Sequence, residues 1–542
     1  MFAASRGSLL VAPNALDARG PAHGLRPQSA LPRSRSPFPR ARSYRYVTAD
    51  CDADADVFYS HHFGATTSDA VRLIVAAGTD IDCGGFMTDE APRAIADGNV
   101  TQEQLDEMLR RLFRVRLRLG HFDPPGALQT IGTDQICSNY SVEVARDGAR
   151  QGAVLLKNDG GLLPLRGAYQ RVVVIGPLMD QRDNTYYYGG TPCFNAQPCP
   201  LDSVQEHVAS TVVGLHGVPS VSSNDTSGVA AAAAEAADAD LVIMVVGSDL
   251  SLEVEGQDRL SIAFSEAQLA LVAAVAAAAR GPIVVQVHSG GAMDVAPLLA
   301  NEKIGAIVHA GQPSVQVPGV GDVLFGATPD GRAVAPAGRM SQTIYAASFV
   351  DDVSMFDFGM RPGPSAWPPG TNPGRTHRFY SGVPTLPFGY GLSFTTWLYT
   401  PLPDRAPPRG FAAVKRAAEA HAASGVLGHI PAALQEVAAD FFVNVTNTGA
   451  VDSDDVVLGF IVPPGAGTGG VPLQELFGFE RVFVRAGETV TVYLGAQGVR
   501  FCQADTTGVR RFLEGDYTVR FGVRETAGKG MGFVERRLSV RA

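Results

Sequence analysis

Four stretches between residues 170 and 310 consist almost entirely of aliphatic side chains. They are Val172–Ile175, 241–246, 283–287 and 304–309. Near-continuous apolar runs of this kind are typical of parallel strands that are buried on both faces of a sheet. Helical stretches alternate with them, one Ala-rich at Val229–Ala237 and one at 266–280, where Ser265 and Gln268 have capping-box spacing. This alternation predicts a layered α/β sandwich domain over residues 170–400.

Apolar and polar residues alternate with a period of two from residue 441 onward. The alternating runs are 442–446, 456–461, 482–484, 490–494 and 517–523. Clusters of Gly and Asp separate the runs, and this pattern predicts a β-sandwich of the immunoglobulin or fibronectin type III kind over residues 436–542. The preceding segment, 401–435, is Pro-rich and then Ala-rich, and is predicted to be a linker.

Two strand-helix units are predicted before residue 125. A short strand at 44–48 is followed by helical patterns at Thr67–Ala77 and at 102–119, the second with apolar residues at helical period. The order resembles the closing units of a (β/α)8 barrel, so residues 44–125 are predicted to be the C-terminal remnant of such a barrel. Residues 126–169 are then expected to be an interdomain linker.

The N-terminus differs in composition from the rest of the chain. Its first 45 residues hold eight Arg, no Lys and a single acidic residue, Asp17. The longest apolar stretch, 9–12, is shorter than the roughly 7–15 residues of a signal-peptide core, so no signal peptide is visible. Residues 1–43 are therefore expected to be a disordered or transit-like leader.

Composition and charge exclude several classes of function. The 542 residues are 45% hydrophobic and 18% charged, with a formal net charge of −10 and no basic cluster after the leader. A nucleic-acid partner usually requires a basic face, and a membrane span requires about 18 apolar residues in a row. We therefore expect neither nucleic-acid binding nor a membrane span; no oligomeric state follows from the sequence.

The six Cys residues indicate no metal site. Cys193 and Cys199 lie in one Pro-flanked loop, close enough in sequence to pair in a short disulfide. Their spacing is not that of a zinc site, and no matching His or Cys pair follows. Neither a metal nor a cofactor is predicted.

Two acidic loops follow predicted strands. Asp50 begins the first, which continues Asp-x-Asp-x-Asp over 52–56 but lacks the central Gly and final Glu of a calcium loop. The second, after the strand at 241–246, holds Glu253 and Glu255. Simple helix capping would explain the first of these loops. Both loops are compatible with glycoside hydrolysis, which needs one carboxyl on each side of the scissile bond.

Ordered motifs resemble those of glycoside hydrolase family 3, of the β-xylosidase/α-L-arabinofuranosidase type. Residues 49–52 read Ala-Asp-Cys-Asp where the nucleophile segment of that family reads Ser-Asp-Cys-Asp. Further motifs follow in family order over about 45–540: 77–84, 155–160, 163–165, 253–259, 373–380, 386–393, 478–481 and 486–488. The chain is identified as similar to that family.

The resemblance implies a retaining double displacement on a xylan-derived oligosaccharide or aryl glycoside. Asp50 is implied as the nucleophile that forms a covalent glycosyl-enzyme. Glu255, directly before the Gly-x-Asp-Arg motif, is implied as the acid/base, with Glu253 as the alternative. The acid/base carboxyl needs a raised pKa, so one of the two should occupy the drier or more acidic setting.

Four further residues are candidates for substrate binding, each with a structural alternative. His61 and His62 either line the sugar pocket or lie on the surface. Arg259 either contacts sugar or orders its loop by pairing with a carboxylate. His288, at a strand end on the same sheet edge, either lies near the pocket or makes a structural hydrogen bond.

The chain departs from the family pattern in two respects. Ala49 replaces the usual Ser, and only two of eight barrel units fit between Tyr44 and Phe122. A two-stranded piece of barrel exposes edges and inner layers. Two other hypotheses therefore remain, an inactive fragment or truncated gene model, and a non-catalytic carbohydrate-binding remnant. The resemblance also implies an extracellular or cell-wall location.

Overall fold

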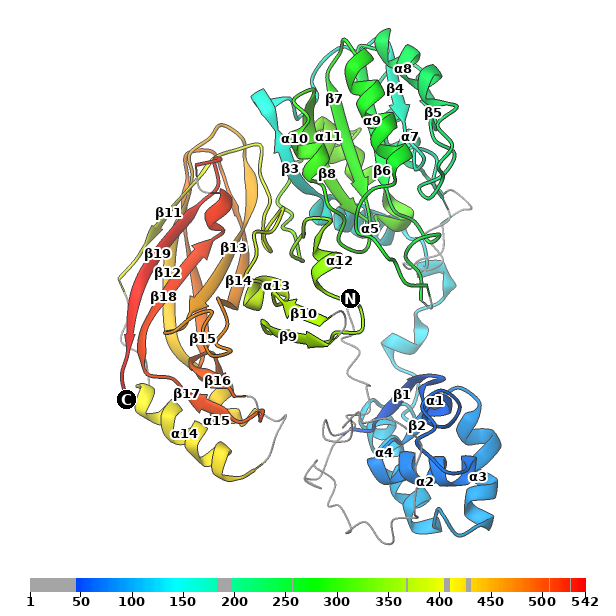
Figure 1. Cartoon of the computed structure of the whole chain (residues 1–542), viewed down its shortest axis with the longest axis vertical. Coiled ribbons are helices and arrows are strands. Elements are labelled where there is room, and N and C mark those ends of the chain that lie inside the picture. Colours follow the sequence, from blue (N-terminus) through cyan, green and yellow to red (C-terminus); the bar gives the residue numbers. More distant parts are fainter. Residues whose placement is uncertain are drawn as a thin grey trace. The chain divides into compact units, whose positions relative to one another are not determined.

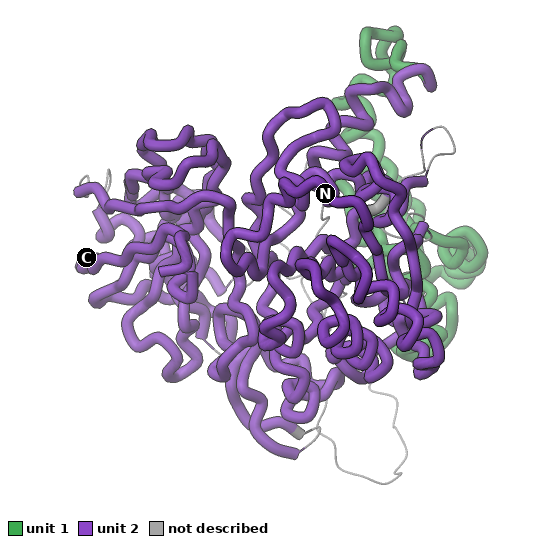
Figure 2. Tube along the Cα trace, turned by 90° about the horizontal axis from the view of Figure 1, so that it is seen from above, with its two compact units in different colours: residues 1–132 green, residues 133–542 purple. Residues whose placement is uncertain are grey.

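The computed structural model divides into two compact units, residues 1–132 and 133–542 (Figure 2). It describes residues 45–182, 193, 197–255, 257–366, 369–403, 410–425, 430–505, 507–526 and 528–542. The predicted leader over 1–43 lies outside these residues. Within them, no helix is both long and apolar enough to cross a membrane.

Over its described residues, 45–132, unit 1 has two parallel strands and four α-helices. They are β1 (Thr48–Cys51), α1 (Ala53–Tyr59), α2 (Thr67–Ala77), β2 (Ile81–Cys83), α3 (Phe86–Ala96) and α4 (Gln102–Arg118). The helices α2 and α4 lie where the apolar period predicted them, and the Thr101 and Gln104 capping box opens α4. The first strand was predicted too early, since β1 begins only at Thr48. A small core of Val57, Val71, Ile74 and Phe86 holds the unit together.

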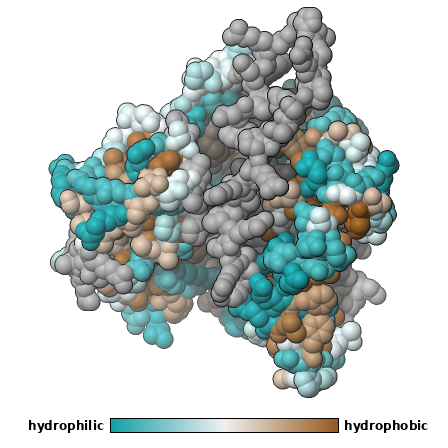
Figure 3. All heavy atoms as spheres, turned by 90° about the horizontal axis from the view of Figure 1, so that it is seen from below, coloured by the Kyte–Doolittle hydropathy of each residue, from teal (hydrophilic) through white to brown (hydrophobic). Residues whose placement is uncertain are grey.

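Unit 1 also exposes much apolar surface. The large apolar side chains exposed in its described residues are Val47, Tyr59, Phe63, Ile95, Leu109, Phe113, Leu117, Leu119, Phe122, Leu128 and Ile131. Four of these belong to or directly follow α4. Figure 3, which draws one face of the whole molecule, shows hydrophobic side chains open beside hydrophilic ones. Two strands and four helices therefore bury only part of the apolar surface that this segment carries.

Unit 2 begins with a six-stranded sheet that is buried on both faces (Figure 1). Its order is β3-β8-β7-β6-β4-β5, in which all strands but β3 are parallel. The bounds are β3 (Val154–Asn158), β4 (Val172–Ile175), β5 (Val212–Leu215), β6 (Leu241–Gly247), β7 (Ile283–His288) and β8 (Ile304–Gly311). Four of these strands are the apolar runs of the sequence, so the prediction of buried parallel strands is confirmed.

Helices cover both faces of this sheet. They are α5 (Asn139–Gly152), α7 (Pro200–Gln205), α8 (Val229–Ala237), α9 (Glu266–Ala278), α10 (Ala296–Ala300) and α11 (Pro318–Phe325). On one face, α8 and α9 pack against strand side chains such as Val173 and Met244. On the other face, α7 and α11 pack against strand side chains such as Val174 and Ile243. Neighbouring residues of one strand thus enter opposite cores, which explains why the strands contain almost no polar residue.

The segment predicted as a linker over 126–169 is instead part of this α/β layer. It contains α5 and β3, and Val154 to Leu156 are buried. The prediction was wrong because β3 is a short antiparallel edge strand, which has no neighbouring strand-helix repeat in the sequence to mark it. The disulfide prediction was also wrong, since Cys193 pairs with Cys137. Cys199 is free and buried at the start of α7, with its backbone N–H donating to Asp202.

Two antiparallel sheets form the C-terminal part of unit 2. One is β11-β12-β15 and the other β14-β13-β18-β19. Their bounds are β11 (Trp397–Pro401), β12 (Val437–Asn447), β13 (Ser453–Val462), β14 (Glu475–Val484), β15 (Thr489–Gln497), β18 (Gly515–Gly522) and β19 (Phe533–Val540). Side chains of both sheets share one core, and Phe441, Val443 and Val445 of β12 enter it at every second position, as the alternation predicted.

The predicted linker over 401–435 is also corrected. It contains α14 (Phe411–Ala423) and α15 (Ala432–Gln435), and Phe411, Val414 and Leu434 join the core of the two sheets. Smaller elements complete the unit: α12 (Phe349–Asp352), β9 (Gly363–Ala366), β10 (Pro369–Asn372), α13 (Thr376–Phe379), β16 (Cys502–Ala504) and β17 (Arg510–Phe512).

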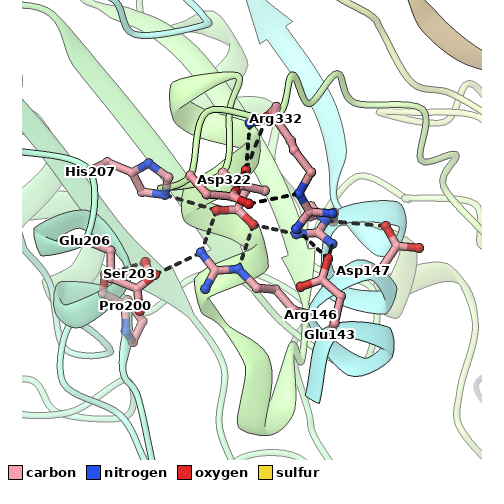
Figure 4. Close-up of polar contacts among 12 residues, drawn as sticks. Glu143, Arg146, Asp147, Pro200, Ser203, Glu206, His207, Asp322 and Arg332 are labelled. Atoms are coloured by element: carbon pink, nitrogen blue, oxygen red, sulfur yellow. Dashed lines mark hydrogen bonds and ion pairs between the residues drawn. The ribbon is translucent and has the colours of Figure 1, made fainter. Parts of the chain in front are cut away.

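A buried carboxylate attaches α5 to the sheet domain (Figure 4). Asp322 of α11 has no exposed side-chain surface, and its two oxygens accept from Arg146 at 2.7 and 2.6 Å and from Arg150 at 2.8 Å. His207 Nε2 lies 3.1 Å from Asp322 Oδ1. Burial alone would raise the pKa of Asp322, but these partners hold that pKa well below its ordinary range. The backbones of α11 and α5 can come this close because residue 319 is a glycine. A Cβ at Gly319 would lie 2.3 Å from the carbonyl oxygen of Arg146.

Replacing Asp322 by Asn should strongly destabilise unit 2. The variant leaves two arginines without their buried counter-charge, a change that costs about 3–5 kcal/mol in comparable networks. Because the folded-state pKa of Asp322 is depressed, its contribution is present at neutral pH and is lost as the pH falls below about 4. Urea unfolding at pH 7 measures the loss, with the exposed Glu302→Gln as control; equal midpoints for the two variants would contradict this role.

Candidate active site

Asp50 lies on the surface of unit 1, at the carboxyl end of β1. Its side chain is exposed, and Oδ1 accepts from the backbone N–H of Cys51 at 2.8 Å. A disulfide joins Cys51 to Cys83 of β2, and the N–H of Asp52 donates to the carbonyl oxygen of Cys83 at 2.7 Å. The ends of both strands are thus fixed to one another, so the Asp50 carboxylate stands on a rigid base and is open to an incoming molecule.

The acidic residues after Asp50 occupy a different setting. Asp54 is 1% exposed, and burial followed by the charge of Asp82 raises its pKa to about 6. Asp54 Oδ2 and Asp82 Oδ1 are buried without a hydrogen-bond partner among the described residues. Gly84, at a φ of +155°, is required here, because a Cβ would lie 2.7 Å from Asp52 Oδ1. The alternating acids of this loop therefore occupy different environments, with Asp50 on the surface and Asp54 in the interior.

His61 and His62 lie on the surface just beyond α1. Both side chains are exposed, and His62 has a positive φ of 49°. The backbone N–H groups of both residues donate to carbonyl oxygens of α1 and so terminate the helix. Within unit 1 these contacts match the surface interpretation of the two histidines, and their contact with sugar stays a prediction.

Glu253 lies in unit 2, in the loop that follows β6. Its Oε1 accepts from the N–H of Gly290 at 2.6 Å and from the side-chain amide of Gln312 at 3.2 Å. Its Oε2 accepts from the N–H of Gly291 at 3.0 Å and lies 3.6 Å from Arg259 Nη1. The glycines follow β7 and Gln312 follows β8, so this single carboxylate connects loops from three neighbouring strand ends.

These donors determine the charge of Glu253. Burial, which leaves 11% of the side chain exposed, would raise the pKa. The hydrogen bonds from Gly290, Gly291 and Gln312 outweigh burial and hold the pKa of Glu253 below its ordinary value. Both oxygens accept hydrogen bonds, which favours the ionised form. Glu253 therefore does not have the raised pKa that we expected of an acid/base group.

Glu255, two residues further on, is exposed at the same edge of the sheet. The short bridge between Val254 and Gln257 turns the chain there. Arg259 closes the loop: its Nη2 donates to the carbonyl oxygen of Ala292 at 2.8 Å while Nη1 faces Glu253. The loop-ordering alternative for Arg259 is thus what the structure shows.

His288 is buried at the end of β7 and does not line an open pocket. Its Nε2 lies 3.2 Å from Gln286 Oε1, and burial, with a smaller effect of His309, lowers its pKa to about 3. His309 is also buried, with Nε2 3.1 Å from the hydroxyl of Ser289. Its Nδ1 accepts from the N–H of Gly311 at 3.3 Å, which places the proton of the neutral ring on Nε2. These contacts match the structural alternative for His288, and its proximity to the sugar pocket stays a prediction.

No group of three His, Cys, Asp or Glu side chains in the described part of the chain is arranged to hold a metal ion.

Comparison with known proteins decides the family. Residues 153–394 match the glycosyl hydrolase family 3 C-terminal domain. The probable β-D-xylosidase 6 of Arabidopsis thaliana is 33% identical over 498 residues, which cover 88% of this chain and 60% of that protein. A β-xylosidase/α-L-arabinofuranosidase 2 of Medicago sativa is 32% identical, over 81% of this chain and 55% of that protein. The chain belongs to glycoside hydrolase family 3.

A solved structure of a family 3 enzyme has the same fold. The exo-β-xylosidase XlnD, solved with a xylobiose aziridine probe, superposes with a TM-score of 0.77 at 26% identity. The match covers 92% of this family 3 chain and 62% of XlnD. The chain therefore spans about 60% of the length of the relatives it matches.

Several functional residues of this family 3 chain escaped the sequence analysis. Gly290, Gly291 and Gln312 are 37 to 59 positions from Glu253 in sequence, and no local pattern connects them to it. His309 ended a predicted strand, and a lone His in an apolar run was the only available signal. Asp54 was seen as one of four alternating acids, without a sign that it alone is buried.

Asp54→Asn should stabilise unit 1 at neutral pH. Because the folded-state pKa of Asp54 is raised to about 6, the wild-type unit loses stability as the pH rises from about 4 to about 6. The amide carries no charge, so we expect a gain of about 1–3 kcal/mol at pH 7.5 and a flatter pH dependence. Thermal unfolding at pH 5 and pH 7.5 tests this, with the exposed Asp97→Asn as control. A loss of stability at pH 7.5 would refute the assignment.

Proposed function

We propose that this chain is a retaining glycoside hydrolase that releases β-D-xylose, and also α-L-arabinofuranose, from xylan-derived oligosaccharides. The observation that carries the proposal is the pair of family 3 acidic segments, each with an exposed carboxylate at the carboxyl end of a parallel strand. The names of the relatives, β-xylosidases of plants and fungi and a bifunctional Medicago enzyme, support the substrate class.

Asp50 is the nucleophile in this proposal. An attacking carboxylate must be ionised and reachable, and Asp50 is exposed on a strand end fixed by the disulfide Cys51–Cys83. It attacks the anomeric carbon, and the glycosidic oxygen departs with a proton from the acid/base group. Water, deprotonated by the same group, then releases the sugar with its configuration retained.

Glu255 is the acid/base in this proposal. Glu253 is held as an anion by the two glycine N–H groups and Gln312, so it lacks the proton that the first step requires. Glu255 lies in the same loop with an exposed side chain, where a bound sugar can reach it. His61 and His62 stay candidates for substrate contact.

Membership of family 3 also supports proposals about the domains of the chain and its location. We propose that unit 1 corresponds to the closing strand-helix units of a (β/α)8 barrel, since its two strands are parallel and each is followed by helices. The two C-terminal antiparallel sheets correspond to a fibronectin type III-like domain. The disulfides Cys51–Cys83 and Cys137–Cys193 support an extracellular or cell-wall location, because such bonds persist in oxidising compartments.

Hydrolysis assays on the purified chain test the function. Aryl β-D-xyloside and aryl α-L-arabinofuranoside should both be cleaved, and Asp50→Asn should lower kcat by roughly 10³-fold or more. Glu255→Gln should slow the hydrolysis of xylobiose, whose sugar leaving group is poor, far more than that of an aryl xyloside, whose leaving group needs little proton assistance.

Two other outcomes would overturn this proposal. Absent hydrolysis with retained binding of xylan would favour a carbohydrate-binding remnant. Absence of both would favour an inactive fragment. The exposed Asp97→Asn serves as control, since it makes the same chemical change away from both acidic segments.

A further inference from the structure

The loop that carries Glu255 follows β6 at the carboxyl edge of the sheet. This acid/base loop comprises residues 249–255 and 257–259. Its residues 255, 257 and 258 are exposed, and only Leu252 packs against the core beneath. Asp249 orders its first turn by accepting from the N–H of Ser251 through its side chain and from the N–H of Glu253 through its carbonyl. Neither contact reaches another strand end, whereas Arg259, at the far end of the loop, reaches the turn after β7 by donating to the carbonyl oxygen of Ala292 at 2.8 Å.

The Glu253 side chain provides a further connection. Its carboxylate crosses to both neighbouring strand ends, reaching Gly290 and Gly291 after β7 and Gln312 after β8. Gln312 in turn donates to the carbonyl oxygen of Ser248 at 3.0 Å, at the point where the loop leaves β6. The ends of three adjacent strands are thus joined through one carboxylate.

We infer that Glu253 is a positioning residue, whose carboxylate anchors the acid/base loop to the ends of β7 and β8 and thereby holds Glu255 at the carboxyl edge of the sheet. Its catalytic consequence rests on the proposed function; the anchoring itself does not. Two adjacent N–H groups that point to the two oxygens of one carboxylate give charge-assisted hydrogen bonds, which are about twice as strong as neutral ones.

The glycine pair of the β7 turn is fitted to this anchor. A Cβ on Gly291 would lie 2.8 Å from Arg259 Nη2 and 3.3 Å from Glu253 Oε2. Any side chain at this position therefore displaces the arginine that closes the loop and crowds the anchoring carboxylate. Gly291→Ala thus perturbs the same attachment from the opposite side, without altering an acidic residue.

A glutamine cannot replace the carboxylate here. Its amide has one oxygen to accept with, and its NH₂ group would face one of the two backbone N–H donors. Glu253→Gln therefore loses at least one of the backbone hydrogen bonds while it keeps the size of the side chain. The matched control is Glu266→Gln, the same change at an exposed residue in the first turn of α9.

Hydrogen–deuterium exchange of the full chain, read by mass spectrometry, tests the anchor without requiring activity. In Glu253→Gln, peptides covering 249–259 and 289–292 should exchange about 10-fold faster than in wild type, as expected for the loss of about 1.4 kcal/mol of local protection. Gly291→Ala should act in the same direction, and Glu266→Gln should match wild type. Unchanged exchange in Glu253→Gln would overturn the inference.

A pH series separates an ionised anchor from a merely structural side chain. In wild type, protection of 289–292, corrected for intrinsic exchange, should be complete at neutral pH and should fall as the pH drops through the depressed pKa of Glu253. Glu253→Gln should show no such fall. Identical pH profiles of the two proteins would contradict the role of the charge.

Azide distinguishes positioning from proton transfer where the chain is active. Azide attacks the glycosyl-enzyme, displaces the Asp50 carboxylate and needs no general base, so Glu255→Ala should be rescued with formation of β-xylosyl azide. Glu253→Gln, which retains Glu255, should form xylose with a reduced kcat and little azide product. Rescue of Glu253→Gln by azide, without rescue of Glu255→Ala, would overturn the assignment of Glu253 as a positioning residue. Inactivity of the wild type would refute the proposed function and leave the exchange result to decide the anchor.

Discussion

A parallel sheet that is buried on both faces constrains the rest of unit 2. Neighbouring residues of each strand enter opposite cores, so the strands tolerate almost no polar side chain. The polar chemistry must therefore gather where the strands end. Gly247 shows how tight that edge is, since a Cβ there would lie 1.8 Å from the carbonyl oxygen of His288. The Glu253 anchor, the buried histidines and the exposed Glu255 are all consequences of this one edge.

Environment, more than residue type, distinguishes the acids of this chain. Glu253 and Glu255 are two positions apart, yet one is fixed between backbone N–H groups and the other faces solvent. Asp50 and Asp54 also differ in environment. Asp50 is exposed, whereas burial keeps a proton on Asp54 at a pH where a solvated carboxyl would be ionised. Asp322 is buried like Asp54 but remains an anion because two arginines surround it. Burial alone thus does not predict the charge of a carboxyl; the donors around it do.

The sequence predicted what depends on neighbours along the chain. Aliphatic runs located β4, β6, β7 and β8, capping residues marked the starts of α4 and α9, and the family motifs located both acidic segments. It missed what depends on distant partners. The edge strand β3, the pairing of Cys137 with Cys193 and the helix α14 packed on the sandwich core leave no periodic signal. The choice between Glu253 and Glu255 is of the same kind, because it depends on Gly290 and Gly291.

In the proposed mechanism Asp50 forms a covalent bond to a pentose. A 2-deoxy-2-fluoro-β-xyloside with a good leaving group slows the release of such an intermediate, because the fluorine destabilises the oxocarbenium-like transition state. Incubation of the full chain with this reagent, followed by proteolysis and tandem mass spectrometry, should show one added fluoroxylosyl group on the peptide that contains Asp50, and none in Asp50→Asn. Labelling of a different residue, or no labelling of the folded protein, would contradict the account.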